Sequence, residues 1–182
     1  MSPVVFGLAF ALLVPACLSW VPRYRTVATV AATAGVGLTF CVAIADGPAS
    51  GPLAPWGAIV CGLLAAIGGG PFTAQVLDWA ETLARRGTGG ESGAADPDQT
   101  IAAPAPPPAP VLRGGAWIGV LERLGIAAGL LCGWPEAVPV VLAVKGLGRY
   151  PELKHGTSER FIIGTFVSVL WAVAACGISL VT

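Results

Sequence analysis

The sequence has few charged residues and only one histidine. Of its 182 residues, 11% are charged and 55% are hydrophobic, and the mean hydropathy is +0.78. Such a chain has too little polar surface to cover a compact soluble domain. Ten basic and ten acidic residues leave no net charge, and they form no basic face for nucleic acid. The composition predicts an integral membrane protein and excludes a nucleic-acid partner.

The sequence also lacks the motifs that mark most enzyme families. His155 is the single histidine, and there is no HExxH, Walker A or GxSxG motif. The five cysteines lie within or at the ends of apolar segments, and none belongs to a CxxC motif. We therefore expect packing roles for the cysteines, no metal site and no cofactor, and we favour a protein without catalytic activity.

All ten basic residues fall into clusters that one topology places on the same side of a membrane. The clusters are Arg23 and Arg25; Arg85 and Arg86; Arg113 and Arg123; and Lys145, Arg149, Lys154 and Arg160. Apolar segments separate the clusters, and cytoplasmic loops of membrane proteins carry an excess of basic residues. We predict an all-α, polytopic protein of the bacterial cytoplasmic (inner) membrane, with about six transmembrane helices. Both termini are then outside.

The first half of the chain, residues 1–86, contains three apolar segments. The run 3–20 has its basic residues after it, which is the charge order of a retained first helix with its N-terminus outside, and not of a secretory signal. The second crossing is predicted at 26–45. The third begins near Trp56.

A glycine-proline run interrupts the third apolar segment. Residues 68–71 read Gly-Gly-Gly-Pro, after only about eleven apolar residues, too few to cross a hydrocarbon core of about 30 Å. We therefore expect the helix to bend there or to stop and reform, with an amphipathic exit helix following. The interruption is interpreted as a plain hinge, with a broken-helix binding site of the transporter kind as the alternative.

Residues 87–114 are rich in proline, alanine and glycine and have no apolar periodicity. We predict a disordered cytoplasmic linker that separates the three-helix half at 1–86 from a second three-helix half at 115–182. The prolines have no flanking basic or aromatic specificity residues, which favours a spacer over a docking motif.

The second half contains the charges that cost most inside a membrane. Its helices are predicted at 115–134, 137–150 and 159–180, the second being short for a crossing. Glu122 and Arg123 lie within the first of them, where an ionised side chain is expensive unless it is paired. Adjacent helical residues point about 100° apart, so we expect one to face the bundle and the other to reach the headgroups. A helical hairpin would bring Lys145 to the depth of Glu122, and we predict that these two residues pair.

Two groups of residues in the second half stand out together. The first group consists of short segments that contain charged residues: Ile118-Gly119-Val120-Leu121-Glu122-Arg123, Ala143-Val144-Lys145, Arg149, Glu152-Leu153-Lys154 and Glu159. Gly164 and Ser168 belong to a small-residue face suited to close helix packing, and Thr165 flanks this face. With this pattern, the chain from about Gly114 onward resembles a module of uncharacterised bacterial integral-membrane proteins. The resemblance implies no known activity, cofactor or catalytic residue.

Three functions are compatible with these features. The favoured one is a non-catalytic envelope accessory or assembly protein, in which Glu122, Arg123, Lys145, Arg149 and Glu159 form a structural charge network. In the second, the cations bind an anionic lipid or phosphate headgroup at the inner leaflet, with the two glutamates or a histidine available for proton transfer. In the third, a small transporter or ion pathway uses the predicted ion pair as a relay. The expected partners are membrane lipids, including anionic ones, and other membrane proteins or a second copy.

Overall fold

The computed structural model describes residues 1–47, 53–87, 115–148 and 158–182, which form helices and no strand. The helices are α1 (Pro3–Ala11), α2 (Leu13–Leu18), α3 (Arg25–Asp46), α4 (Ala54–Gly87), α5 (Gly115–Leu131), α6 (Ala137–Gly148) and α8 (Ser158–Leu180). The predicted all-α class is confirmed for these residues. Apart from Gly87, the predicted linker lies outside the described residues, as do Arg149 and His155.

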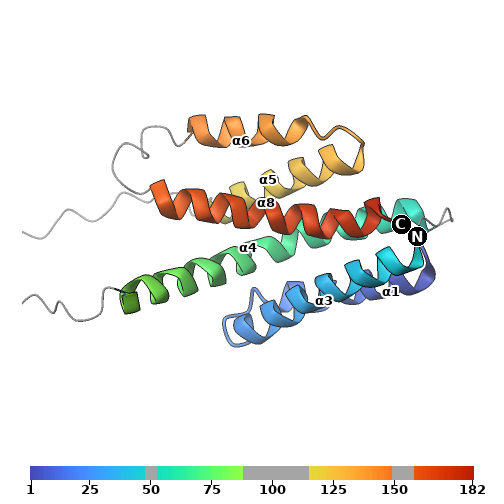
Figure 1. Cartoon of the computed structure of the whole chain (residues 1–182), viewed down its shortest axis with the longest axis horizontal. Coiled ribbons are helices and arrows are strands. Elements are labelled where there is room, and N and C mark those ends of the chain that lie inside the picture. Colours follow the sequence, from blue (N-terminus) through green and yellow to red (C-terminus); the bar gives the residue numbers. More distant parts are fainter. Residues whose placement is uncertain (48–52, 88–114, 149–157) are drawn as a thin grey trace, which may run out of the picture.

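The helices alternate in direction along the long axis of the molecule (Figure 1). Helices α1 and α2 run one way, α3 returns, and each later helix reverses the direction of the one before it. The N-terminus and the C-terminus therefore lie at the same end of the bundle.

Three of the described helices are long and apolar enough to cross a membrane: Arg25–Asp46, Ala54–Arg86 and Glu159–Leu180. The segments Pro3–Leu18 and Ala137–Gly148 are apolar but shorter. At 1.5 Å per residue, the 12 residues of α6 extend about 18 Å, less than a hydrocarbon core of about 30 Å. Length and composition are thus compatible with a membrane protein.

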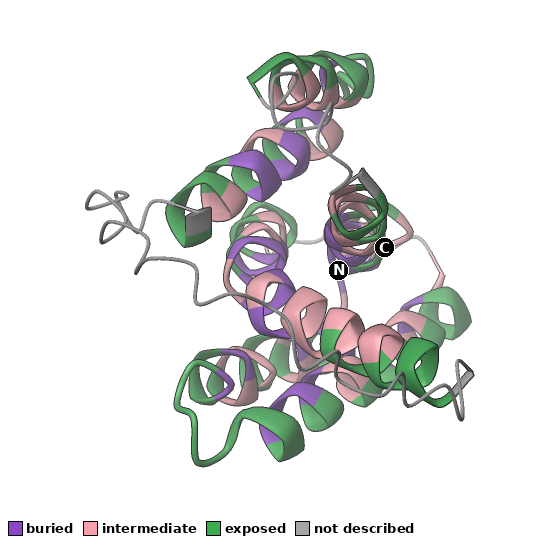
Figure 2. Cartoon of the chain, turned by 90° about the vertical axis from the view of Figure 1, so that its left-hand side faces the viewer, coloured by how far each residue is buried: buried purple, intermediate pink, exposed green. Residues whose placement is uncertain are grey.

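The outer surface of the bundle is apolar. Buried residues lie where the helices face one another, and exposed residues face outward (Figure 2). Large hydrophobic side chains are among the exposed ones, including Val27, Trp117 and Leu147, each more than 70% exposed. A surface of this kind is unusual for a soluble protein and suits contact with lipid.

Helix α4 lies at the centre of the bundle. It contacts α1, α2, α3, α5 and α8, and its most extensive contact is with α8. The core between α4 and α8 includes the fully buried residues Cys61, Leu64, Ala175 and Cys176. The two halves of the sequence therefore pack into one bundle, and α6 lies at its edge against α5.

The expected stop and restart of the helix at residues 68–71 is wrong, because α4 is helical throughout its 34 residues with Pro71 inside it. A proline lacks the N–H that would bond the carbonyl of the residue four positions earlier. That carbonyl belongs to Ile67, and the indole Nε1 of Trp20 donates a hydrogen bond to it at 3.0 Å. A side chain from the α2–α3 connection thus replaces the bond that Pro71 cannot make, and the helix continues.

The three glycines before Pro71 are sites of close packing. A Cβ at Gly68 would overlap with the ring of Trp171, and a Cβ at Gly70 would lie 3.1 Å from the ring of Trp20. The absence of side chains here lets two indoles approach the α4 backbone. The run that predicted a hinge therefore forms a contact surface of a continuous helix.

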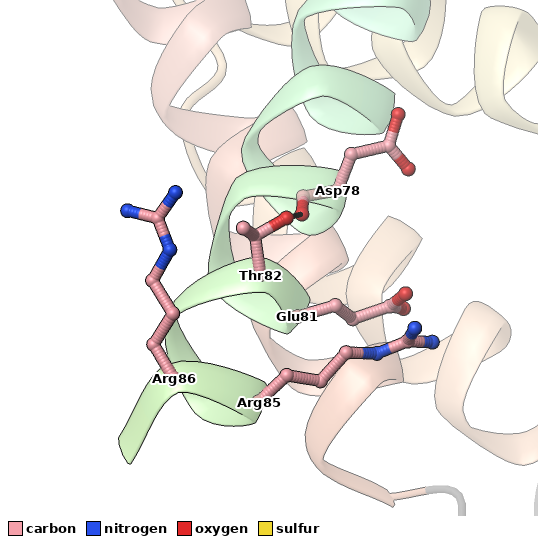
Figure 3. A pocket seen from close by; sticks show the side chains of 5 residues that line it. All are labelled: Asp78, Glu81, Thr82, Arg85 and Arg86. Carbon is pink, nitrogen blue, oxygen red and sulfur yellow. Dashed lines mark hydrogen bonds between the residues drawn. The ribbon is translucent and has the colours of Figure 1, made fainter. Parts of the chain in front are cut away.

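The expected amphipathic exit is the C-terminal part of α4. Asp78 forms an ion pair with Arg25 of α3 at 3.0 Å, and Glu81 pairs with Arg160 of α8. Asp78, Glu81 and Arg85 extend to one side of the helix and Arg86 to the other (Figure 3). Both ion pairs are exposed, so each contributes only about 0–1 kcal/mol to stability. They mark one end of the bundle as charged.

We predict that Trp20→Phe lowers the free energy of unfolding by about 0.5–1.5 kcal/mol, the usual net contribution of one intramolecular hydrogen bond. In a Pro71→Ala background the same change should cost clearly less, because the introduced alanine supplies the missing N–H to Ile67. Denaturation of the four purified proteins in detergent micelles measures this coupling. An equal cost of Trp20→Phe in both backgrounds would show that the indole does not replace the proline's missing bond.

Candidate functional site

Helix α5 positions the two ionisable residues on which the site is built. Glu122 and Arg123 are adjacent near the middle of α5, and only 7% and 3% of their surfaces are exposed. Adjacent helical side chains point about 100° apart, so each faces a different neighbour. The expectation that one of them extends out of the bundle towards the headgroups is wrong, because both are buried and α5 contacts α4, α6 and α8.

Glu122 faces α6. Lys145 Nζ donates to Glu122 Oε2 at 2.5 Å, so the predicted ion pair is present. The Lys145 ammonium also lies 5.6 Å from the ring centre of Phe161 on α8, within the range of a cation–π contact. The pair is shielded from solvent, since the side chain of Glu122 is 5% exposed and that of Lys145 is 21% exposed.

Arg123 faces α4 and α8. Its Nε donates to the backbone carbonyl of Ala66 at 3.0 Å, and its Nη1 donates to the hydroxyl of Ser168 at 3.1 Å. Ser168 was expected only as a small packing residue, and the structure makes it a hydrogen-bond partner as well. Ala66 could not be found from sequence, because its contribution is a backbone oxygen.

Glycines make the space for the Arg123 side chain. A Cβ at Gly69 would overlap with the Arg123 side chain, and a Cβ at Gly119 would lie 3.3 Å from Arg123 Nη1. A Cβ at Gly70 would lie 3.4 Å from Nη2. Two consecutive glycines of α4 and one of α5 therefore bring the guanidinium against the α4 backbone. The run of three glycines in one apolar segment, together with an arginine inside another, is a sequence signal for this contact. The signal can be used only if the helix that contains the glycines is known to be continuous.

One turn of α4, residues 64–67, accepts hydrogen bonds from three other parts of the chain. Trp171 Nε1 donates to the carbonyl of Leu64 at 3.2 Å, Arg123 Nε donates to that of Ala66 at 3.0 Å, and Trp20 Nε1 donates to that of Ile67 at 3.0 Å. We call this segment the 64–67 turn. Through it, the α2–α3 connection, α5 and α8 are all bonded to the same stretch of backbone.

The remaining predicted residues fall into three groups. Gly164 lies at the α4–α8 contact, where a Cβ would be at ordinary distance from Leu77 and Thr73, and Thr165 is half-buried beside it. Glu159 is exposed in the first turn of α8 and lies outside the buried network. Arg149 belongs to a part of the chain that is not described.

The arrangement is suited to connecting helices. Glu122 bonds α5 to α6, and Arg123 bonds α5 to α4 and α8. Among the residues described, no three His, Cys, Asp or Glu side chains gather where they could hold a metal ion. Two adjacent charges on one helix thus connect four helices of the bundle.

We predict that Gly69→Ala lowers the free energy of unfolding by about 1–3 kcal/mol, because the added methyl group overfills the space beside Arg123. Gly37→Ala on α3 is the matched control, since nothing lies within 4 Å of its Cβ position. The control should be neutral or should stabilise by up to about 1 kcal/mol. Denaturation in micelles compares the two, and equal effects would contradict the proposed packing.

Comparisons with family models, with curated proteins and with solved structures find no match to this chain. The resemblance of the second half to a module of uncharacterised bacterial membrane proteins therefore stays a prediction. The interpretation of the site rests on the hydrogen bonds, the ion pair and the packing described above.

Proposed function

We propose that this chain is a non-catalytic envelope accessory or assembly protein of a bacterial inner membrane, and that its buried charges are structural. The observation that carries the proposal is that Glu122 and Arg123, adjacent on α5, are bonded to different helices. The carboxylate is bonded to Lys145 of α6, and the guanidinium is bonded to Ala66 of α4 and Ser168 of α8. The carboxylate thus holds α5 against α6, and the guanidinium holds α5 against α4 and α8.

The energetics of burial support this role. Removing one partner of a buried ion pair typically costs about 3–5 kcal/mol, because the other charge is left unpaired. The Glu122–Lys145 pair therefore favours a single register between α5 and α6. The ammonium of Lys145, which is bonded to Glu122, also faces the ring of Phe161 of α8.

The geometry favours the structural network over a headgroup clamp. A clamp needs cations that converge on one phosphate group. Arg123 and Lys145 lie on different sides of α5, and Lys145 is already bonded to Glu122. Arg123 and Lys145 are therefore not arranged to bind the same phosphate group.

We propose six crossings in two three-helix halves, with the charged end of the bundle in the cytoplasm and both termini outside. The alternating directions of the helices support this (Figure 1), as does the gathering of Arg25, Arg85, Arg86 and Arg160 at one end. The α5–α6 hairpin is too short to cross at full thickness, so it requires a locally thinned bilayer. Lipids, other membrane proteins or a second copy would contact its exposed residues Leu121 and Val144.

Reporter fusions test this topology. Reporters fused after Ser50 and after Thr182 should report a periplasmic location. A reporter fused after Gly90 should report a cytosolic location. The expected order follows from alternating crossings and the positive-inside rule. Paired reporters, one active only in each compartment, provide the control, and any other order rules out the proposed orientation.

A double-mutant cycle tests the structural role of the ion pair. Glu122→Gln and Lys145→Met should each lower the yield of folded protein in detergent, with a cost of about 3–5 kcal/mol for the broken pair. The double variant should recover much of the loss, because no unpaired charge remains. Size-exclusion profiles and thermal unfolding measure the effect. Arg25→Met, which removes an exposed pair with Asp78, is the control and should cost about 1 kcal/mol or less. Additive losses in the double variant would refute a structural pair.

A further inference from the structure

Arg123 is a buried cation that forms no ion pair among the described residues. Its surface is 3% exposed, and none of the ion pairs in the described part of the chain includes it. The neighbouring carboxylate of Glu122 faces α6, where Oε2 is bonded to Lys145 and Oε1 has no hydrogen-bond partner. The acceptors of Arg123, a carbonyl and a hydroxyl, are dipoles that satisfy N–H groups and leave the charge in place. Buried charges in a membrane are expensive unless an opposite charge accompanies them.

Buried hydroxyls without partners lie on the two helices that face Arg123. Thr73 Oγ1 of α4 and Thr165 Oγ1 of α8 are both buried and have no hydrogen-bond partner. Residues three apart on a helix are neighbours on its surface. Thr73 is one turn from Gly70, which adjoins Arg123 Nη2, and Thr165 is one turn from Ser168, which accepts from Nη1. A Cβ at Gly164 would lie 3.7 Å from Thr73 Cγ2, so these faces of α4 and α8 are in contact.

The chemistry of this group is that of an anion site. A guanidinium has five N–H donors and no acceptor, and a serine or threonine hydroxyl has one donor. Arg123 uses Nε and one N–H of Nη1 in the bonds described above, and the Ser168 hydroxyl still has its own proton to donate. The set therefore combines one positive charge with several unused donors at the junction of α4, α5 and α8.

The Arg123 guanidinium is closely surrounded by helix backbone. A Cβ at Gly119 would lie 3.3 Å from Nη1 and a Cβ at Gly70 would lie 3.4 Å from Nη2, and Arg123 is 3% exposed, so only a small anion would fit beside it. A lipid headgroup could not reach it. We propose that Arg123, Ser168, Thr73 and Thr165 bind a monatomic anion of the halide class, such as chloride. The site goes beyond the accessory role proposed above and requires only the packing around Arg123.

The first experiment measures thermal unfolding of the full-length protein in detergent micelles, in sodium chloride and in sodium gluconate at constant ionic strength. A ligand that binds only the folded state stabilises it by mass action. Tm should therefore rise with chloride concentration and reach a plateau, with no such rise in gluconate. Identical Tm values in the two salts at every concentration would overturn the proposal.

The second experiment removes the unpartnered hydroxyls. The double variant Thr73→Val, Thr165→Val keeps the side-chain shapes, and it should raise the chloride concentration at half-maximal stabilisation by tenfold or more. In gluconate it should be at least as stable as the wild type, because two unsatisfied hydroxyls are gone. Thr33→Val is the control, since that hydroxyl donates to the carbonyl of Thr29 within α3, and its chloride response should be unchanged. An unchanged chloride response in the double variant contradicts the site.

A direct measurement needs no variant. Crystals of the wild-type protein grown in sodium bromide should give an anomalous peak within hydrogen-bond distance of an Arg123 Nη atom. A well-ordered Arg123 without such a peak would exclude the site.

Discussion

The hydrogen bonds that the 64–67 turn accepts are the constraint on which the rest of this structure depends. Inside a bilayer no water replaces a missing hydrogen bond, and each unsatisfied backbone group costs several kcal/mol. Pro71 leaves the carbonyl of Ile67 without its helical donor, and Trp20 supplies another. Arg123 and Trp171 donate to the same turn from α5 and α8. Because α4 stays continuous there, it can serve as the central helix against which the others pack.

The glycines and the buried charges are two parts of one arrangement. Gly69 and Gly70 bring the α4 backbone close enough for Arg123 to bond it, and the adjacent Glu122 is left to face α6. Helix α5 thus connects α4 and α8 on one side with α6 on the other. This explains why charged residues occur inside an apolar helix in a sequence that has so few of them. A protein of this design uses its charges to set the positions of helices, which is the basis for the accessory or assembly role proposed above.

Much of the helical organisation could be predicted from the sequence, because it follows from local patterns. The apolar runs and the turn residues between them predicted α3 and α8 to within one residue at each end. The Glu122–Lys145 pair followed from helix periodicity and the cost of buried charge. The break at residues 68–71 was predicted from the local preference of glycine and proline, and tertiary donors, above all Trp20, override that preference. The partners of Arg123 were not predictable, since Ala66 contributes only its backbone carbonyl and the approach depends on α4 remaining unbroken.

The continuity of α4 through residues 68–71 is the claim that can be tested most directly. Spin labels introduced as unnatural amino acids at Ile59 and Leu83, two exposed positions on α4, leave the native cysteines in place. Pulsed electron paramagnetic resonance in lipid nanodiscs then measures the distance between them. A continuous helix predicts a single narrow distribution centred near the Cα separation of about 36 Å, given a rise of 1.5 Å per residue. A broad distribution at clearly shorter distances would mean that the helix bends or breaks at the glycines, and would contradict this account.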